Sequence, residues 1–201
     1  MHKVIIEPAV ASEADVAARL TFMAYHRFSY DIFGQVGEYA AHDYFRKLWR
    51  HGRNRFGCDY SFIAKLDDEP VGLMTCYPSS LIMKLVGPTI RQIFLIGGVR
   101  FIWHFLTHLG NFYHFASNQD CQPNELYVAT LSVLPEYRRM GVGAEMLRFA
   151  RRTTLEQGLK RCALHVNAEN ADGIRFYERN GFTKAPPIEH RATYFRMVYS
   201  V

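Results

Sequence analysis

The sequence predicts a single α/β domain in which helices flank a central mixed sheet, and three observations lead to this prediction. The chain has 201 residues, of which 49% are hydrophobic, enough to build one substantial core. Segments rich in β-branched and aromatic residues alternate with segments of helical periodicity. No repeat, low-complexity tract or long block of like charge divides the chain. We therefore treat residues 1–201 as one domain.

The N-terminal quarter is expected to hold a strand followed by two helices. Residues 3–7 form the strand, and Ser12 is the expected N-cap of the first helix. A second helix is predicted over residues 37–50. Four of its apolar residues are expected near one face: Tyr39, Tyr44, Phe45 and Leu48. These two helices would form one wall of the domain.

A β-hairpin is expected next along the chain. Residues 59–66 and 71–77 have strand composition, and the acidic segment 67–70 between them ends in proline. Aspartate and proline are typical of tight turns, so the two segments are predicted to pair as antiparallel neighbours.

Residues 79–121 form an unusually apolar helical insertion between the third and fourth strands. The run from Ile90 to Phe115 has the length of a membrane-spanning helix, but Arg100 near its middle would be costly in a bilayer. We interpret it as two amphipathic helices broken near a glycine. Three roles stay open for the insertion: additional core or a dimer face, a wall of a binding pocket, or contact with a membrane.

The C-terminal part alternates strands and helices. Strands are predicted over residues 125–134, 161–167 and 193–199, and helices over 141–157 and 170–180. Glycines stand just after both helices, where a helix commonly ends. The resulting order of strand, turn, helix, strand, helix and strand is typical of a mixed sheet covered by helices.

The charge of the chain leaves room for an anionic partner without pointing to nucleic acid. The net charge is +5 and the pI is about 9.1. The basic residues are scattered, and no basic run is interleaved with aromatic residues. A solvated basic surface is therefore the preferred interpretation, and no nucleic-acid partner is expected.

The four cysteines, Cys58, Cys76, Cys121 and Cys162, predict neither a metal site nor a disulfide framework. None lies within a few residues of another, as zinc-ligand pairs do. The first residues contain no apolar signal core. A cytoplasmic protein with reduced thiols and no metal is the expectation.

A glycine-containing turn is the first candidate binding site. Residues 138–144, Arg-Arg-Met-Gly-Val-Gly-Ala, follow a predicted strand and open a predicted helix. A helix N-terminus offers unpaired N–H groups and partial positive charge, which suit a pyrophosphate. The strict dinucleotide and Walker patterns are absent, so an ordinary strand-to-helix turn is an equally good interpretation of this stretch alone.

Two longer motifs give this turn a context. Residues 131–144, Leu-Ser-Val-Leu-Pro-Glu-Tyr-Arg-Arg-Met-Gly-Val-Gly-Ala, resemble motif A of the GNAT superfamily of N-acetyltransferases. Residues 170–182, Asn-Ala-Asp-Gly-Ile-Arg-Phe-Tyr-Glu-Arg-Asn-Gly-Phe, are similar to motif B of that family, with Gly173 in place of the usual alanine. The resemblance covers about residues 124–183. It implies a GNAT-like fold, with a central mixed and mostly antiparallel sheet flanked by helices.

The resemblance also implies acetyl-coenzyme A as cosubstrate and assigns residues to it. The motif A strand would line the pantetheine arm, the turn would hold the pyrophosphate, and Asn170 would contact the cosubstrate near its thioester. The Leu131 N–H would stabilise the oxyanion that develops on the acetyl group. The implied binding residues are Leu131, Ser132, Val133, Arg138, Arg139, Met140, Gly141, Val142, Gly143, Ala144, Asn170 and Tyr177.

Tyr177 matches the general acid of the family, which returns a proton to the departing thiolate. Without the motif it would be interpreted as a half-buried helix tyrosine. For the general base, some protein-acetylating relatives carry a glutamate where this chain has Tyr127. Glu125 lies on the same strand face and is a candidate for the general base. The alternative interpretation is a solvated carboxylate at the end of the strand. His165 on the next strand is a second candidate for the base. The alternative interpretation is a histidine that is hydrogen-bonded in the core.

The prediction is an enzyme that transfers acetyl from acetyl-CoA directly to the amine of a small molecule or peptide. Two alternatives stay open: a non-catalytic acetyl-CoA-binding module that acts through a partner, and a membrane-surface acyltransferase. Membrane contact is the less favoured of these interpretations. A homodimer that buries the insertion would also fit. The acceptor itself cannot be named from the fold.

Overall fold

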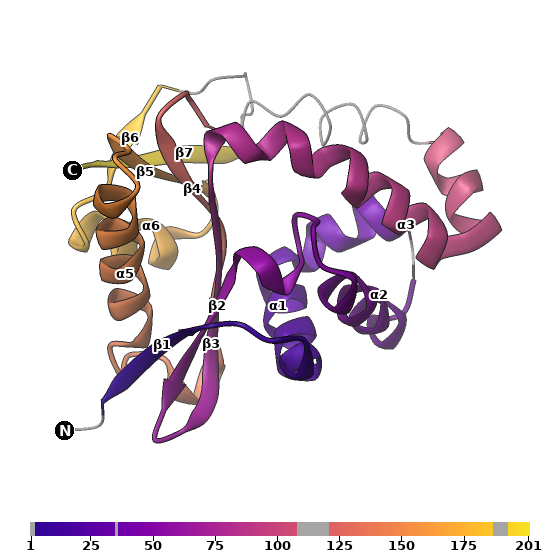
Figure 1. Ribbon diagram of the computed structural model, residues 1–201, viewed down its shortest axis with the longest axis horizontal. Coiled ribbons are helices and arrows are strands. Elements are labelled where there is room, and N and C mark those ends of the chain that lie inside the picture. The colour runs from indigo at the N-terminus through magenta and orange to yellow at the C-terminus, as the bar shows by residue number, and fades with distance from the viewer. Residues whose placement is uncertain (1–2, 35, 108–120, 187–192) are drawn as a thin grey trace.

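The computed structural model describes residues 3–34, 36–107, 121–186 and 193–201 (Figure 1). Its strands are β1 (Val4–Pro8), β2 (Ser61–Leu66), β3 (Glu69–Pro78), β4 (Glu125–Val133), β5 (Arg161–Asn167), β6 (Thr183–Ala185) and β7 (Tyr194–Ser200). Its α-helices are α1 (Ala14–Phe33), α2 (Glu38–His51), α3 (Ser79–Thr107), α5 (Val142–Glu156) and α6 (Ala171–Arg179).

The strands form one seven-stranded sheet in the order β1-β2-β3-β4-β5-β7-β6. All neighbours are antiparallel except β4 and β5, which are parallel. Helix α5 covers one face of the sheet, and α1 and α2 lie on the other (Figure 1). This arrangement confirms the predicted mixed, mostly antiparallel sheet flanked by helices.

Two irregularities in β4 set the geometry of the centre of the sheet. Between β3 and β4 the register steps from Thr75 opposite Thr130 to Cys76 opposite Val128, so Ala129 is an extra, bulged residue. Pairing of β4 with β5 begins at Glu125 and ends at Val128 opposite Leu164. Beyond the bulge the two parallel strands diverge, and the edge of β4 that faces β5 has no strand partner there among the described residues.

The predicted hairpin is present between β2 and β3. Asp67 and Asp68 both have positive φ, at 51° and 66°, which is the backbone of a two-residue turn of the type that matches strand twist. The turn residues were therefore recognisable from their composition.

The start of α1 corrects one prediction. A 3₁₀ turn over Ala11–Glu13 precedes the helix, and Glu13 rather than Ser12 occupies its N-cap position. The Glu13 carboxylate accepts a hydrogen bond from the Val10 backbone N–H at 2.9 Å. The predicted face of α2 is also wrong at one position, because Tyr39 is 82% exposed.

Helix α3 gives the insertion its form. It begins at Ser79, where the predicted insertion starts, continues through Pro88 and is kinked at Gly98, where φ is 60°. The predicted break near a glycine is thus confirmed, whereas residues 108–115 of the apolar run lie outside the described residues. The inner face of α3 contributes Ile93 and Phe101 to an aromatic core shared with α1 and α2.

Candidate functional site

The divergence of β4 from β5 opens a cleft with a volume of about 1180 Å³. One wall comes from β4 beyond the bulge, and the other from β5 and α6. The turn before α5 closes one end, and α1 with the loop around Arg55 and Phe56 lies at the other. Segments from the whole length of the chain therefore meet in one cavity.

The turn before α5 has the geometry of an anion site. Gly141 is the N-cap with φ +85°, and no side chain caps the helix. The first N–H groups of α5 are therefore left for a ligand. Arg138 and Arg139 also line the cleft, and the Arg138 Nε donates to the Val133 carbonyl at 3.2 Å. Positive charge thus adds to the helix dipole at this end of the cleft.

Two further glycines near this turn allow close contacts that a Cβ would obstruct. A Cβ at Gly143 would lie 3.0 Å from the Phe176 ring, so glycine here allows α5 and α6 to pack. A Cβ at Gly173 would lie 2.6 Å from Asn170 Nδ2. Asn170 caps α6, because its Oδ1 accepts the Gly173 N–H at 2.9 Å. The glycine that replaces the usual alanine of the motif therefore fits the tight approach of the Asn170 side chain.

The bulge in β4 is held by a tyrosine from α1. The Tyr25 hydroxyl donates to the Ala129 carbonyl at 2.6 Å and accepts from the Thr130 hydroxyl at 3.2 Å. Tyr25 also packs edge-to-face on Phe56, another residue of the cleft. These contacts fix the point from which β4 and β5 diverge.

Tyr177 lies on α6 in the wall of the cleft. Its ring packs beside Phe176 and Phe182, and burial raises the pKa of its hydroxyl to about 12. The hydroxyl is therefore protonated at neutral pH and is able to donate a proton.

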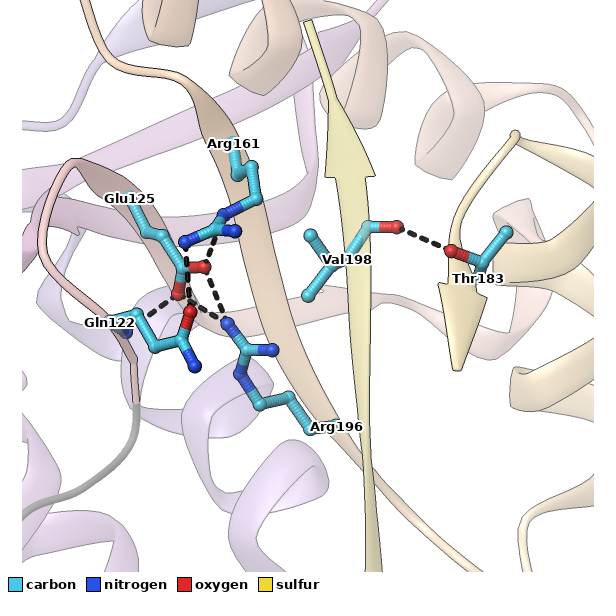
Figure 2. A network of polar contacts seen from close by, with 6 residues as sticks. All are labelled: Gln122, Glu125, Arg161, Thr183, Arg196 and Val198. Carbon is cyan, nitrogen blue, oxygen red and sulfur yellow. Dashed lines mark hydrogen bonds and ion pairs between the residues drawn. The ribbon is translucent and has the colours of Figure 1, made fainter. Parts of the chain in front are cut away.

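Glu125 is at the closed end of the divergence, where β4 and β5 still pair (Figure 2). Its fully buried carboxylate accepts two hydrogen bonds from the Arg196 guanidinium, at 2.5 and 2.6 Å. The Arg161 Nε lies 2.8 Å from the same carboxylate, and the Gln122 N–H donates to it at 2.7 Å. Glu125 is also not among the residues that line the cleft. These contacts make Glu125 part of a buried ion-pair network.

His165, the second base candidate, does line the cleft. It is half-buried on β5, and its Nδ1 lies 3.4 Å from the Tyr127 hydroxyl on β4. The two side chains bridge the strands where they begin to diverge.

The structure brings most of the residues assigned from the motifs into this one cleft. The exceptions are Glu125 and Met140, which is 47% exposed beside the turn. Several lining residues were missed by the sequence analysis: Met23, Tyr25, His26, Arg55, Phe56, Asn167 and Tyr194. They stand outside both motifs, and no local sequence signal distinguishes them. Within the described part of the chain, no cluster of three or more His, Cys, Asp or Glu side chains could hold a metal.

Comparison with known proteins identifies related sequences. The family model described as "Acetyltransferase (GNAT) family" matches residues 23–182. N-alpha-acetyltransferase 50 of Danio rerio is 34% identical over 74 residues, which cover 36% of this chain and 42% of that protein. Spermidine N(1)-acetyltransferase of Thermoplasma acidophilum is 32% identical over 59 residues, covering 29% of this chain and 37% of that protein. The similarity thus spans less than half of these relatives.

Solved structures show the same fold over nearly the whole chain. An N-acetyltransferase from Staphylococcus aureus Mu50 superposes with a TM-score of 0.77 at 14% identity, covering 97% of this chain and 100% of that one. The PaiA N-acetyltransferase of Thermoplasma acidophilum, solved in complex with coenzyme A, superposes with a TM-score of 0.58 at 14% identity and covers 99% of both chains. At this identity the likeness shows the fold, and the predicted fold class is confirmed.

Proposed function

This chain belongs to the acetyltransferase (GNAT) family, and we propose that it transfers an acetyl group from acetyl-CoA directly to an amine. One observation carries the proposal. A single cleft connects the uncapped N-terminus of α5, the unpaired edge of β4 and Tyr177. Anion binding, backbone hydrogen bonding and proton donation are thus available along one continuous path.

The residues present fit coenzyme A. The N–H groups after Gly141 and the guanidinium groups of Arg138 and Arg139 suit the pyrophosphate. Residues 131–133 of β4 offer backbone groups to the pantetheine amides, because β5 has moved away from that edge. Asn170 uses Oδ1 to cap α6, and its Nδ2 is left to contact the cosubstrate.

Side chains of this protein are assigned the proton transfers of the reaction. Acetyl-CoA supplies an activated acetyl group as its thioester. We assign to Tyr177 the donation of a proton to the thiolate that departs, because burial keeps its hydroxyl protonated. The Leu131 N–H is assigned to the developing oxyanion, as the motif implies.

We assign removal of the amine proton to His165 rather than Glu125. His165 lines the cleft, whereas the Glu125 carboxylate is bound by two guanidinium groups at the closed end of the strands. Glu125 does not line the cleft, so an amine bound there would have no direct contact with its carboxylate.

The acceptor is proposed to be an amine of a small molecule or peptide. Two relatives are named N-alpha-acetyltransferase 50 and spermidine N(1)-acetyltransferase, names that share only a nitrogen acceptor, so the proposal is limited to the amine class. The acceptor is expected to enter beside α1, where Met23, Tyr25, His26, Arg55 and Phe56 line the cleft.

The test is release of coenzyme A thiol from acetyl-CoA in the presence of a panel of peptides, polyamines, amino acids and amino sugars. We expect at least one amine to accelerate release and to be acetylated. His165→Gln should lower kcat about 10²-fold on that amine, whereas His51→Gln, a change at the exposed end of α2, should not. Tight binding of acetyl-CoA with no turnover on any amine would contradict an enzymatic role.

A further inference from the structure

Helix α3 is apolar on two opposite sides. Its inner side is buried against the rest of the molecule, as shown by Ile82, Leu85, Ile93 and Phe101, each at most 4% exposed. Its outer side carries large apolar residues that are mostly exposed: Met83, Leu95, Val99, Ile102, Trp103 and Leu106. We call these six residues the outer face of α3. A helix that is apolar all round is normally covered on every side, so the outer face points to a partner.

The outer face is highly exposed both before and after the kink. Leu95 is 68% exposed, Val99 82% and Trp103 71%. Leu95 lies before the kink at Gly98, and Val99 and Trp103, four residues apart, lie on one side of the helical segment after it. Helix α3 runs along one edge of the molecule and extends beyond α2 (Figure 1). The exposed fractions show that the outer face is open to solvent.

The charges around this face indicate the chemistry of the partner. From Val71 to Gln119 the sequence contains no aspartate and no glutamate. Lys84 and Arg91 lie exposed on α3 itself. A second copy of the chain, pairing through the same face, would add its own Lys84 and Arg91 to the interface and no carboxylate from its α3. An anionic surface would instead attract them.

We propose that the outer face of α3 docks on the surface of an anionic phospholipid bilayer. The aliphatic side chains would enter the boundary between headgroups and acyl chains. Trp103 would lie at the membrane–water interface, where tryptophan is enriched. Lys84 and Arg91 would lie among anionic headgroups, as on the negatively charged leaflets that face a cytoplasm. The sequence alone disfavoured membrane contact, and the exposed fractions along α3 reverse that preference.

The helix lies on the bilayer and does not cross it. Residues Ser79–Val99 are long and apolar enough to span a membrane by length and composition. Their inner side, however, is built into the protein. The Thr89 hydroxyl accepts the Arg55 backbone N–H at 3.0 Å, and the Gln92 side chain accepts from Asn54 Nδ2 at 2.7 Å. Crossing the bilayer would break these bonds and expose the aromatic core of α1 and α2.

Docking would also place the cleft relative to the membrane. The loop that α3 holds through Thr89 and Gln92 supplies Arg55 and Phe56 to the cleft. The inner side of the docked helix therefore holds a loop that forms part of the cleft wall. The docking proposal itself rests on α3 alone and does not depend on the proposed reaction.

The test is sedimentation of the full chain with vesicles of phosphatidylcholine mixed with phosphatidylglycerol, beside vesicles of phosphatidylcholine alone. We expect saturable binding to the mixed vesicles that weakens with added salt. The double variant Leu95→Gln/Trp103→Gln should lower the partition coefficient about tenfold or more. Lys84→Gln/Arg91→Gln should lower it on mixed vesicles only. Leu155→Gln is the matched control, because Leu155 is 62% exposed on α5, and it should bind like the wild type.

A second readout separates the proposal from dimerisation. The Trp103 fluorescence should shift to shorter wavelength on addition of mixed vesicles, and Trp103→Phe should abolish the shift. Sedimentation velocity would reveal a dimer that Leu95→Gln/Trp103→Gln dissociates. Such a dimer without vesicle binding would overturn the proposal, as would vesicle binding that the double variant leaves unchanged.

Discussion

The hydroxyl of Tyr177 combines the two properties that a proton donor needs. It belongs to a residue of the cleft wall, and burial raises its pKa from about 10 to about 12, so it holds its proton throughout the neutral range. The same residue would be an ordinary half-buried tyrosine if α6 were placed elsewhere. Its role therefore depends on the position that the Asn170-capped helix gives it.

Replacing Tyr177 with phenylalanine removes the donor and keeps the ring. We expect kcat to fall about 10²-fold, with the Kd for acetyl-CoA changed only slightly. Because the pKa is about 12, the wild-type rate should show no alkaline loss from Tyr177 near pH 10. Steady-state kinetics on an active amine would check this, with the exposed Tyr39→Phe as control. An unchanged kcat would remove Tyr177 from the reaction.

Glu125 provides a second prediction for a single residue. Glu125→Gln would leave the Arg196 side chain, which is 3% exposed, as a buried cation without its anion. We expect the free energy of unfolding to fall by about 3 kcal/mol in urea titrations. Glu136→Gln, which removes a carboxylate 52% exposed and 3.8 Å from Arg19, should change it by less than about 1 kcal/mol. A stable Glu125→Gln protein whose kcat falls 10²-fold would restore Glu125 as the base.

At the scale of elements, the bulge in β4 determines where the cleft can form. An extra residue at Ala129 interrupts the ladder with β3, and beyond it β4 no longer pairs with β5. Helix α1 contributes to this point, because Tyr25 hydrogen-bonds both Ala129 and Thr130. A helix near the N-terminus thus positions a strand in the centre of the sheet.

Removing the Tyr25 hydroxyl should weaken the contacts that hold β4 where it diverges from β5. Tyr25→Phe is expected to cost about 1 kcal/mol of unfolding free energy and to raise the Kd for acetyl-CoA several-fold. Calorimetric titration measures the second effect. Tyr44→Phe is the control, because Tyr44 packs in the same aromatic core and has no hydrogen bond among the residues placed in the structure. Equal affinities of Tyr25→Phe and wild type would contradict the positioning role.

At the scale of the whole molecule, the sheet buries neutral groups that ionise only when the chain unfolds. Burial raises the pKa of the Cys162 thiol from 9 to about 12 and that of Cys76 further still. Above pH 9 the unfolded thiols lose protons that the folded thiols keep. The unfolded state then binds fewer protons, so stability is full below pH 9 and declines as pH rises toward 12.

Unfolding free energies measured between pH 9 and about 11 should reveal this decline. Each buried thiol contributes a slope of about 1.4 kcal/mol per pH unit once its unfolded form is ionised. Cys162→Ala should flatten the curve, whereas Leu164→Ala on the same strand should lower it at every pH without changing its slope. Identical slopes in the two variants would show that Cys162 does not carry the effect.

The parts of the fold that local signals specify were predictable from the sequence. The strand over residues 161–167 has the predicted bounds, and the glycine turn at residue 141 opens its helix as expected. The ion pair of Glu125 with Arg196 could not be predicted, since the two residues are 71 positions apart. The Tyr25 contact spans 104 residues and has no local signal either. The outer face of α3 also required the structure, because apolar composition alone does not tell which side is covered.

Titration of acetyl-CoA into the purified protein by calorimetry, beside two glycine variants, tests the central claim most directly. Gly141→Glu and Gly158→Glu both place a glutamate at positive φ with open space around it, at opposite ends of α5. Of these two glycines, Gly141 lines the cleft and Gly158 does not. We predict saturable binding to the wild type and to Gly158→Glu, and loss of binding in Gly141→Glu. Absence of binding to the folded wild type, or equal binding by both variants, would contradict the assignment of this cleft to acetyl-CoA.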